Sequence, residues 1–212
     1  VKSLIDEVNM NYLAIDTSRS SLTVAVGGKK SAVSFLPDCA LNHSVVLMDE
    51  IEKCLALAGI DKTEIDVFAC CVGAGSFTGI RIGVATVKAL AYALQKKVLG
   101  VTSFDVLAYN ISDGRKKLAV IDARHDNFYV SGFDENMHVC FLPSFIGLSE
   151  LKELSGEYEI ISDCEIEGVP HIVADVKDGF IKAVEAKLGY ASENVETLVP
   201  LYVKKSQAEE ES

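Results

Sequence analysis

The chain has 212 residues, of which 49% are hydrophobic and 24% charged, which is the composition of a globular protein of one domain or two small ones. Its 31 acidic and 20 basic side chains give a formal net charge of −11. This balance disfavours direct binding to nucleic acid, because such binding depends on clustered Lys and Arg. Short basic clusters, such as residues 115–117, are interpreted as solvated.

The first part of the chain predicts an α/β unit. Residues 13–16 form an apolar run that ends on Asp16, and a polar turn at 17–21 separates it from a second apolar run, a pattern typical of two adjacent strands. Apolar residues recur every three or four positions over 43–58, which predicts an amphipathic helix that stops at Gly59. Further strands are predicted at 22–26, 67–72 and 97–101, and further helices at 80–94 and from 103 to about 111.

The second part of the chain repeats this opening. Residues 118–122 predict a strand that again ends on an acidic residue, Asp122, and a polar turn leads to a strand at 128–133. A chance similarity is the alternative, because the combination of strand, turn and strand is common. Further strands are predicted near 138–142, 159–162 and 172–176, with helices at 148–154 and 178–188. The proposed division is 1–9 (an upstream extension or an expression remnant), 10–105 (first lobe), 106–207 (second lobe) and 208–212 (acidic tail).

A glycine-rich loop precedes the helix at 80–94. Glycine allows positive φ and close approach of another chain segment, and a helix N-terminus can bind an anion. A P-loop is excluded, since no Gly-Lys-Ser/Thr follows, and a dinucleotide loop or a nucleophile elbow would need glycine at position 78, which is Thr78. The loop therefore matches none of these sites. Its residues are Gly73, Gly75, Ser76, Phe77, Thr78 and Gly79.

The helix at 80–94 is apolar or small almost all round, so we expect it to be covered on more than one side. It carries Arg81 and Lys88 and is too short to span a bilayer. Two interpretations stay open: a helix buried within its own lobe, or a docking face shared with the helix at 43–58. The candidate docking residues are Leu47, Ile51, Gly79, Arg81, Gly83, Ala85, Ala89 and Ala93.

Cysteine and histidine spacings predict no metal site. None of the six cysteines forms a C-x-x-C pair, and no two of the four histidines are four residues apart, the spacing that would place two ligands on one helix face. Of these, His43 at a helix start is interpreted as a cap or interface group. The first nine residues lack the apolar stretch of a signal peptide. These patterns favour a reduced, cytoplasmic protein that contacts no membrane.

Several motifs resemble the TsaB (YeaZ) family. Residues 75–83 match the family's glycine motif Gly-Ser-Phe-Thr-Gly-x-Arg-x-Gly in full, and the segments at 15–18, 120–124 and 200–209 agree with it as well. One departure is Ala74, where the family usually has proline. The resemblance covers roughly residues 10–209.

This resemblance implies an α/β fold of two ribonuclease-H-like lobes, as in the actin, sugar-kinase and Hsp70 (ASKHA) superfamily. It also implies a role in making threonylcarbamoyladenosine at position 37 of tRNA. In that family the catalytic subunit is the paralogue TsaD, a metal- and nucleotide-binding protein. TsaB pairs with TsaD through first-lobe helices, the ATPase TsaE joins them, and some relatives form homodimers through the same helices. Contact with tRNA is then expected only through a partner.

Independent catalysis is not expected. Asp16, Thr17, Ser18 and Asp122 stand at degenerate phosphate-loop positions, and two carboxylates without a well-held cation would repel a polyphosphate. We therefore predict no catalytic residue and no cofactor, apart from an adenine nucleotide held weakly or shared at an interface. The alternatives are a small ATP-dependent kinase or hydrolase that uses Asp16 and Asp122, a glycoprotease-like metallopeptidase, and a dinucleotide-binding protein.

Overall fold

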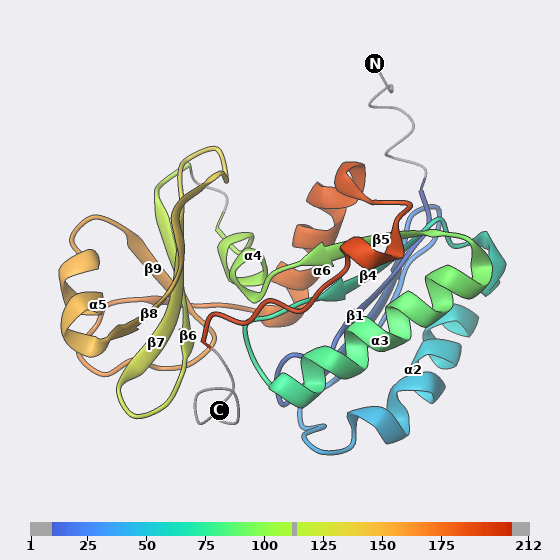
Figure 1. The fold of residues 1–212 in the computed structure, drawn as a ribbon, viewed down its shortest axis with the longest axis horizontal. Coiled ribbons are helices and arrows are strands. Elements are labelled where there is room, and N and C mark those ends of the chain that lie inside the picture. The colour runs from blue at the N-terminus through green and yellow to red at the C-terminus, as the bar shows by residue number, and fades with distance from the viewer. Residues whose placement is uncertain (1–9, 112–113, 205–212) are drawn as a thin grey trace.

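A computed structural model describes residues 10–111 and 114–204 of the chain. Two five-stranded mixed sheets lie side by side, and helices α4 (Ser103–Ala108) and α6 (Val176–Lys187) lie between them (Figure 1). The expectations for 1–9 and for the acidic tail at 208–212 concern segments outside the described residues. The prediction of an α/β protein with two sheets is confirmed.

The first sheet has the strand order β3-β2-β1-β4-β5. β2 is antiparallel to both β1 and β3, whereas β4 is parallel to both β1 and β5. β3 was not predicted, because its alternation of apolar and polar residues is opposite to that of a strand with an apolar buried face: Val33 and Phe35 are exposed and the polar Ser34 is buried. The Ser34 hydroxyl donates a hydrogen bond to the Glu50 carboxylate. The strands are β1 Tyr12–Asp16, β2 Leu22–Gly27, β3 Ala32–Leu36, β4 Val67–Cys71 and β5 Lys97–Val101.

The second sheet repeats this topology with the order β10-β9-β6-β7-β8. Its central strand β6 is antiparallel to the strand that follows it and parallel to β9, as β1 is to β2 and β4. The repeat predicted around Asp16 and Asp122 is therefore present in the sheet topology. The strands are β6 Lys117–Asp122, β7 Asn127–Phe133, β8 Val139–Gly147, β9 Glu159–Ser162 and β10 Ile172–Val173.

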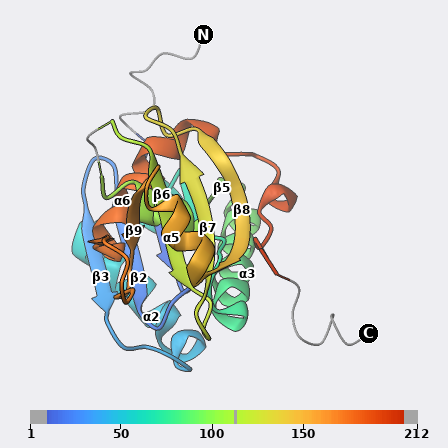
Figure 2. The ribbon, with the colours of Figure 1, turned by 90° about the vertical axis from the view of Figure 1, so that its left-hand side faces the viewer.

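Helices cover both faces of each sheet. On the first sheet, α2 (His43–Ala58) and α3 (Phe77–Leu94) pack on one face and α6 on the other. On the second sheet, α4 packs on the inner face and α5 (Leu148–Leu154) on the outer face (Figure 2). Alternate residues of the strands face opposite helices, as the two-residue period of a strand requires. Single 3-10 turns form at Lys62–Glu64 (η1), Leu188–Tyr190 (η2) and Val195–Thr197 (η3).

The two lobes do not separate at one point of the chain. The boundary between 10–105 and 106–207 falls inside α4, and α6, which comes after it, buries Phe180 against the first sheet. α6 approaches α4 closely because Gly179 has no side chain: a Cβ there would lie 2.1 Å from the Val106 carbonyl oxygen. α4 and α6 therefore join the lobes.

α3 is longer than predicted. It begins at Phe77 because the Ser76 hydroxyl caps it, accepting a hydrogen bond from the Gly79 N–H at 3.2 Å. Its 18 residues make it long and apolar enough to cross a membrane by length and composition alone, and 33% of that stretch is buried in the fold. The prediction that this helix is too short to span a bilayer was wrong on length.

Replacing Phe180 by Ala tests whether α6 belongs to the first lobe's core. Phe180 is fully buried against that sheet, so its loss should lower the free energy of unfolding by about 3–5 kcal/mol in a urea titration. The control is Leu142→Ala at an exposed position, which should change stability by less than about 0.5 kcal/mol. Equal stability of the two variants would contradict this packing.

Candidate docking face and interlobe cleft

One side of α3 is open to solvent. Arg81, Ala85, Ala89 and Ala93 are all exposed, and their four-residue spacing puts them on the same side of the helix. The opposite side packs on the sheet. Its buried residues are Gly79, Ile80, Gly83, Val84, Val87 and Ala91. The small-residue stripe thus lies at the surface of this chain.

α2 runs beside α3 on the same face of the sheet (Figure 1) and adds exposed apolar side chains. Val45 is 72% and Met48 48% exposed, values that are high for such side chains in a helix packed on a sheet. The surface made by Val45, Met48, Arg81, Ala85, Ala89 and Ala93 is named the α2–α3 face below.

Four of the predicted docking residues are not on this face. Leu47 and Ile51 are buried between α2 and the sheet, because the apolar stripe of an amphipathic helix packs on its own core first. Gly79 and Gly83 are buried as well, on the side of α3 that contacts Thr17. Their assignment to a docking surface was wrong.

The glycine loop packs on the turn between β1 and β2. A Cβ at Gly79 would lie 2.0 Å from the Thr17 carbonyl oxygen, and one at Gly75 would lie 2.3 Å from that of Ser18. The Thr17 hydroxyl donates a hydrogen bond to the Gly79 carbonyl at 2.7 Å, and the Ser76 N–H donates to the Ser18 carbonyl at 2.8 Å. The glycines therefore bring two parts of the same lobe together.

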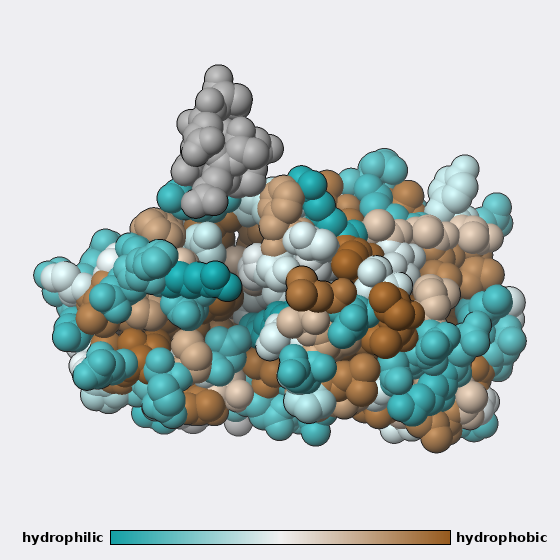
Figure 3. Space-filling view, turned by 90° about the horizontal axis from the view of Figure 1, so that it is seen from below, coloured by the Kyte–Doolittle hydropathy of each residue, from teal (hydrophilic) through white to brown (hydrophobic). Residues whose placement is uncertain are grey.

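A cleft of about 1000 Å³ lies between the lobes, bounded by the β1–β2 turn, the glycine loop and the β6–β7 turn. The surface is hollowed between the two halves on the side seen in Figure 3. At its base, Arg19 Nε donates to Asp163 Oδ2 at 2.6 Å and Nη1 to Asp16 Oδ2 at 3.3 Å. Burial alone would lower the pKa of Arg19, but the Asp16 and Asp163 carboxylates raise it above its ordinary value. An arginine of the chain itself thus joins the carboxylates of the two lobes.

The two acidic residues at the predicted phosphate-loop positions, Asp16 and Asp122, differ in environment. Asp16 is buried and also accepts hydrogen bonds from the Ser18 N–H and hydroxyl at 2.8 and 2.6 Å. Asp122 is exposed and accepts one from the Arg124 N–H at 2.7 Å. The second-lobe partner of Arg19 is instead Asp163, which sequence analysis missed. It follows β9, and only the sheet order shows that β9 lies beside β6.

Several groups in this cleft are already partnered within the chain. The guanidinium of Arg19 stands between Asp16 and Asp163, and the Ser76 and Gly79 N–H groups at the start of α3 are used by Ser18 and Ser76. A phosphate at a helix N-terminus needs such N–H groups free. Within residues 10–111 and 114–204, no three His, Cys, Asp or Glu side chains are grouped so that they could hold a metal ion.

His43 is buried at the start of α2, and its Nε2 donates to the Ser21 carbonyl at 3.1 Å. The ring ties α2 to the β1–β2 turn at the mouth of the cleft. The prediction of a cap or interface group was wrong, because Asn42 is the N-cap of α2 and the His43 ring is buried inside the lobe.

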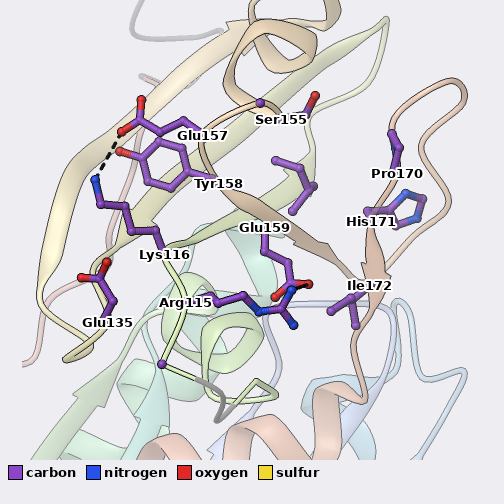
Figure 4. Close-up of a pocket in the computed structure, with 13 residues that line it drawn as sticks. Arg115, Lys116, Glu135, Ser155, Glu157, Tyr158, Glu159, Pro170, His171 and Ile172 are labelled. Carbon is purple, nitrogen blue, oxygen red and sulfur yellow. Dashed lines mark hydrogen bonds and ion pairs between the residues drawn. The ribbon is translucent and has the colours of Figure 1, made fainter.

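Another hollow, of about 730 Å³, lies at the end of the second sheet where β6 and β9 begin (Figure 4). Arg115 and Lys116 each pair with an acidic residue at or just before the start of β9: Arg115 with Glu159 at 2.8 Å and Lys116 with Glu157 at 3.4 Å. Lys117 is buried, and its Nζ donates to the Ile111 carbonyl at 2.7 Å. The expectation that 115–117 is a solvated cluster was therefore wrong for Lys117.

Adding a methyl group at position 79 tests the close approach of α3 to the β1–β2 turn. In Gly79→Ala the Cβ meets backbone rather than a flexible side chain, so we expect a loss of about 2 kcal/mol or more in the free energy of unfolding. Gly147→Ala is the matched control, since a Cβ there has no atom within 4 Å. Thermal unfolding of both variants measures the difference, and similar melting temperatures would contradict the contact.

Comparison with known proteins gives one family. The family model described as "TsaD: tRNA N6-adenosine threonylcarbamoyltransferase" matches residues 35–163. The "tRNA threonylcarbamoyladenosine biosynthesis protein TsaB" of Escherichia coli K12 is 30% identical over 132 residues, which are 60% of this chain and 57% of that protein. The protein of the same name from Bacillus subtilis is 32% identical over 102 residues, 48% of this chain and 44% of its own length. The chain spans about half the length of the curated relatives it matches.

Solved structures agree on the fold. The structure "YeaZ from Pseudomonas aeruginosa" has a TM-score of 0.72 at 22% identity and covers 91% of this chain and 99% of its own. A second structure from that species, described as similar to peptidase YEAZ, has a TM-score of 0.75 at 21% identity and covers 92% and 100%. Because the family model spans more than half of the residues and both of these curated relatives carry the TsaB name, the chain belongs to this family, among its TsaB/YeaZ members.

Proposed function

We propose that this chain is a non-catalytic subunit in the biosynthesis of threonylcarbamoyladenosine in tRNA, and that its α2–α3 face docks on a catalytic TsaD-like paralogue. The observation that carries the proposal is the exposed stripe of Ala85, Ala89 and Ala93. Small side chains allow a partner helix to approach closely, and stable interfaces have an apolar centre. The names of the family model and of the relatives supply the pathway.

The cleft supports the non-catalytic part of this proposal. Its carboxylates Asp16 and Asp163 both pair with the single guanidinium of Arg19. Neither is left free to hold the cation of a magnesium–nucleotide complex, and the remaining negative charge repels a polyphosphate. The proposal also includes an adenine nucleotide shared with the partner and a TsaE-like ATPase in the same assembly. It further includes contact with tRNA only through a partner, a homodimer through the same face, and action in the cytoplasm.

The docking proposal is tested by Ala89→Arg. A long charged side chain in the middle of the α2–α3 face should weaken binding to the TsaD paralogue of the same organism by about 30-fold or more, or about 2 kcal/mol. Ala186→Arg, at an exposed alanine of α6 on the other face of the sheet, is the matched control and should bind normally. Titration calorimetry measures both, after each variant has been shown to melt cooperatively. Equal affinities would refute docking through this face.

The cleft volume of about 1000 Å³ is the observation that favours the alternative, an ATP-dependent enzyme that uses Asp16 and Asp122. That function predicts tight magnesium–ATP binding by the isolated chain, lost in Asp16→Ala. We expect no heat of binding from the unmodified chain at millimolar ATP. Tight binding that Asp16→Ala abolishes would overturn the non-catalytic assignment.

A further inference from the structure

Arg81 is held in a fixed position at the N-terminal end of the α2–α3 face. Its guanidinium carbon lies 3.7 Å from the centroid of the Phe77 ring, and its Nε donates a hydrogen bond to the Tyr202 hydroxyl at 2.9 Å. The Phe77 and Tyr202 rings are themselves stacked, with centroids 4.8 Å apart. Two rings therefore fix the plane of the guanidinium group.

Phe77 and Tyr202, which hold Arg81 in place, lie on parts of the chain that are themselves fixed by hydrogen bonds. Phe77 is the first residue of α3, directly after the Ser76 cap. Tyr202 follows Leu201, whose N–H donates to the Val72 carbonyl at 2.7 Å and whose side chain packs against the core. The C-terminal segment thus carries the tyrosine to the flank of α3.

Arg81 has no acidic partner in the described part of the chain, although acidic residues outnumber basic ones by 31 to 20. Two other exposed cations on helices are paired within the chain, Lys53 with Glu50 at 3.1 Å and Lys182 with Asp178 at 2.7 Å. The terminal nitrogens of Arg81 donate no hydrogen bond within residues 10–111 and 114–204, and the side chain is exposed. Their hydrogen-bonding capacity is available to another molecule.

We propose that Arg81 is a preformed receptor for a carboxylate on the protein that covers the α2–α3 face. The inference rests on the proposed function, because it takes that protein to be the TsaD-like subunit. The part of that subunit that covers this face is a helix surface with an acidic side chain beside small or apolar residues. Its carboxylate accepts hydrogen bonds from the terminal nitrogens of Arg81, and its apolar residues cover Ala85 and Ala89. Nucleic acid is a poor occupant for a chain with a net charge of −11.

Preorganisation is the physical reason to single out this arginine. A free arginine loses rotamer freedom when it binds, whereas Arg81 is already held by ring stacking and one hydrogen bond. Guanidinium–carboxylate pairs are also stronger than neutral hydrogen bonds and have a defined geometry. Arginine and tyrosine together are typical of the residues that dominate interface affinity.

The test is a titration of the TsaD paralogue with three forms of the chain, at low and at high salt. Arg81→Gln removes the charge and should weaken binding by about 10-fold or more at low salt. Tyr202→Phe keeps the ring stack but removes the hydrogen bond that fixes the guanidinium, so a smaller loss of about 3-fold is expected. Salt should weaken binding of the unmodified chain more than that of Arg81→Gln, because the variant lacks the screened ion pair.

Ala89→Arg in the same series separates this inference from the proposed function. If Ala89→Arg binds normally, docking through the α2–α3 face is refuted, and the receptor is refuted with it. If Ala89→Arg binds weakly while Arg81→Gln keeps the affinity and salt dependence of the unmodified chain, only the carboxylate receptor is overturned. Melting temperatures of Arg81→Gln and Tyr202→Phe show whether each variant is folded before its affinity is read.

Discussion

The contact between α3 and the β1–β2 turn is the constraint on which the other features depend. Gly79 and Gly83 bring the helix against Thr17 with no side chain between them, and the Thr17 hydroxyl closes the contact on the Gly79 carbonyl. Helix packing is set by the smallest separation that the side chains allow. With its glycine side turned to the sheet, α3 has to present Ala85 and Ala89 to solvent.

The same turn places Arg19 at the base of the cleft. The Asp16 carboxylate is buried in the first lobe and Asp163 directly follows strand β9 of the second, so the guanidinium joins elements far apart in the sequence. A buried carboxylate needs a partner, since desolvation of an unpaired charge is costly. The partner here comes from the chain itself. The position between the lobes that could attract a cation is therefore already occupied by the guanidinium of Arg19.

Most elements were predictable because their signal is local. The period of apolar residues over 43–58 predicted α2 with the observed ends. The two pairs of adjacent strands whose first strand ends on Asp16 or Asp122 predicted the central strand of each sheet. The second lobe's copy of the topology also follows from this repeat. β3 was not predictable, because its buried residue is the polar Ser34 and its apolar neighbours face solvent.

For the candidate site, the sequence by itself determined which residues are small, which are acidic, and that four-residue spacing aligns Arg81 with Ala85 and Ala89. It did not determine which helix side faces outward: Gly79 and Gly83 belong to the same pattern yet are buried, as is Leu47. Nor did it pair Arg19 with Asp163 or Arg81 with Tyr202. Only the tertiary structure decided these contacts, because they join residues more than a hundred positions apart, and no local period records such a distance.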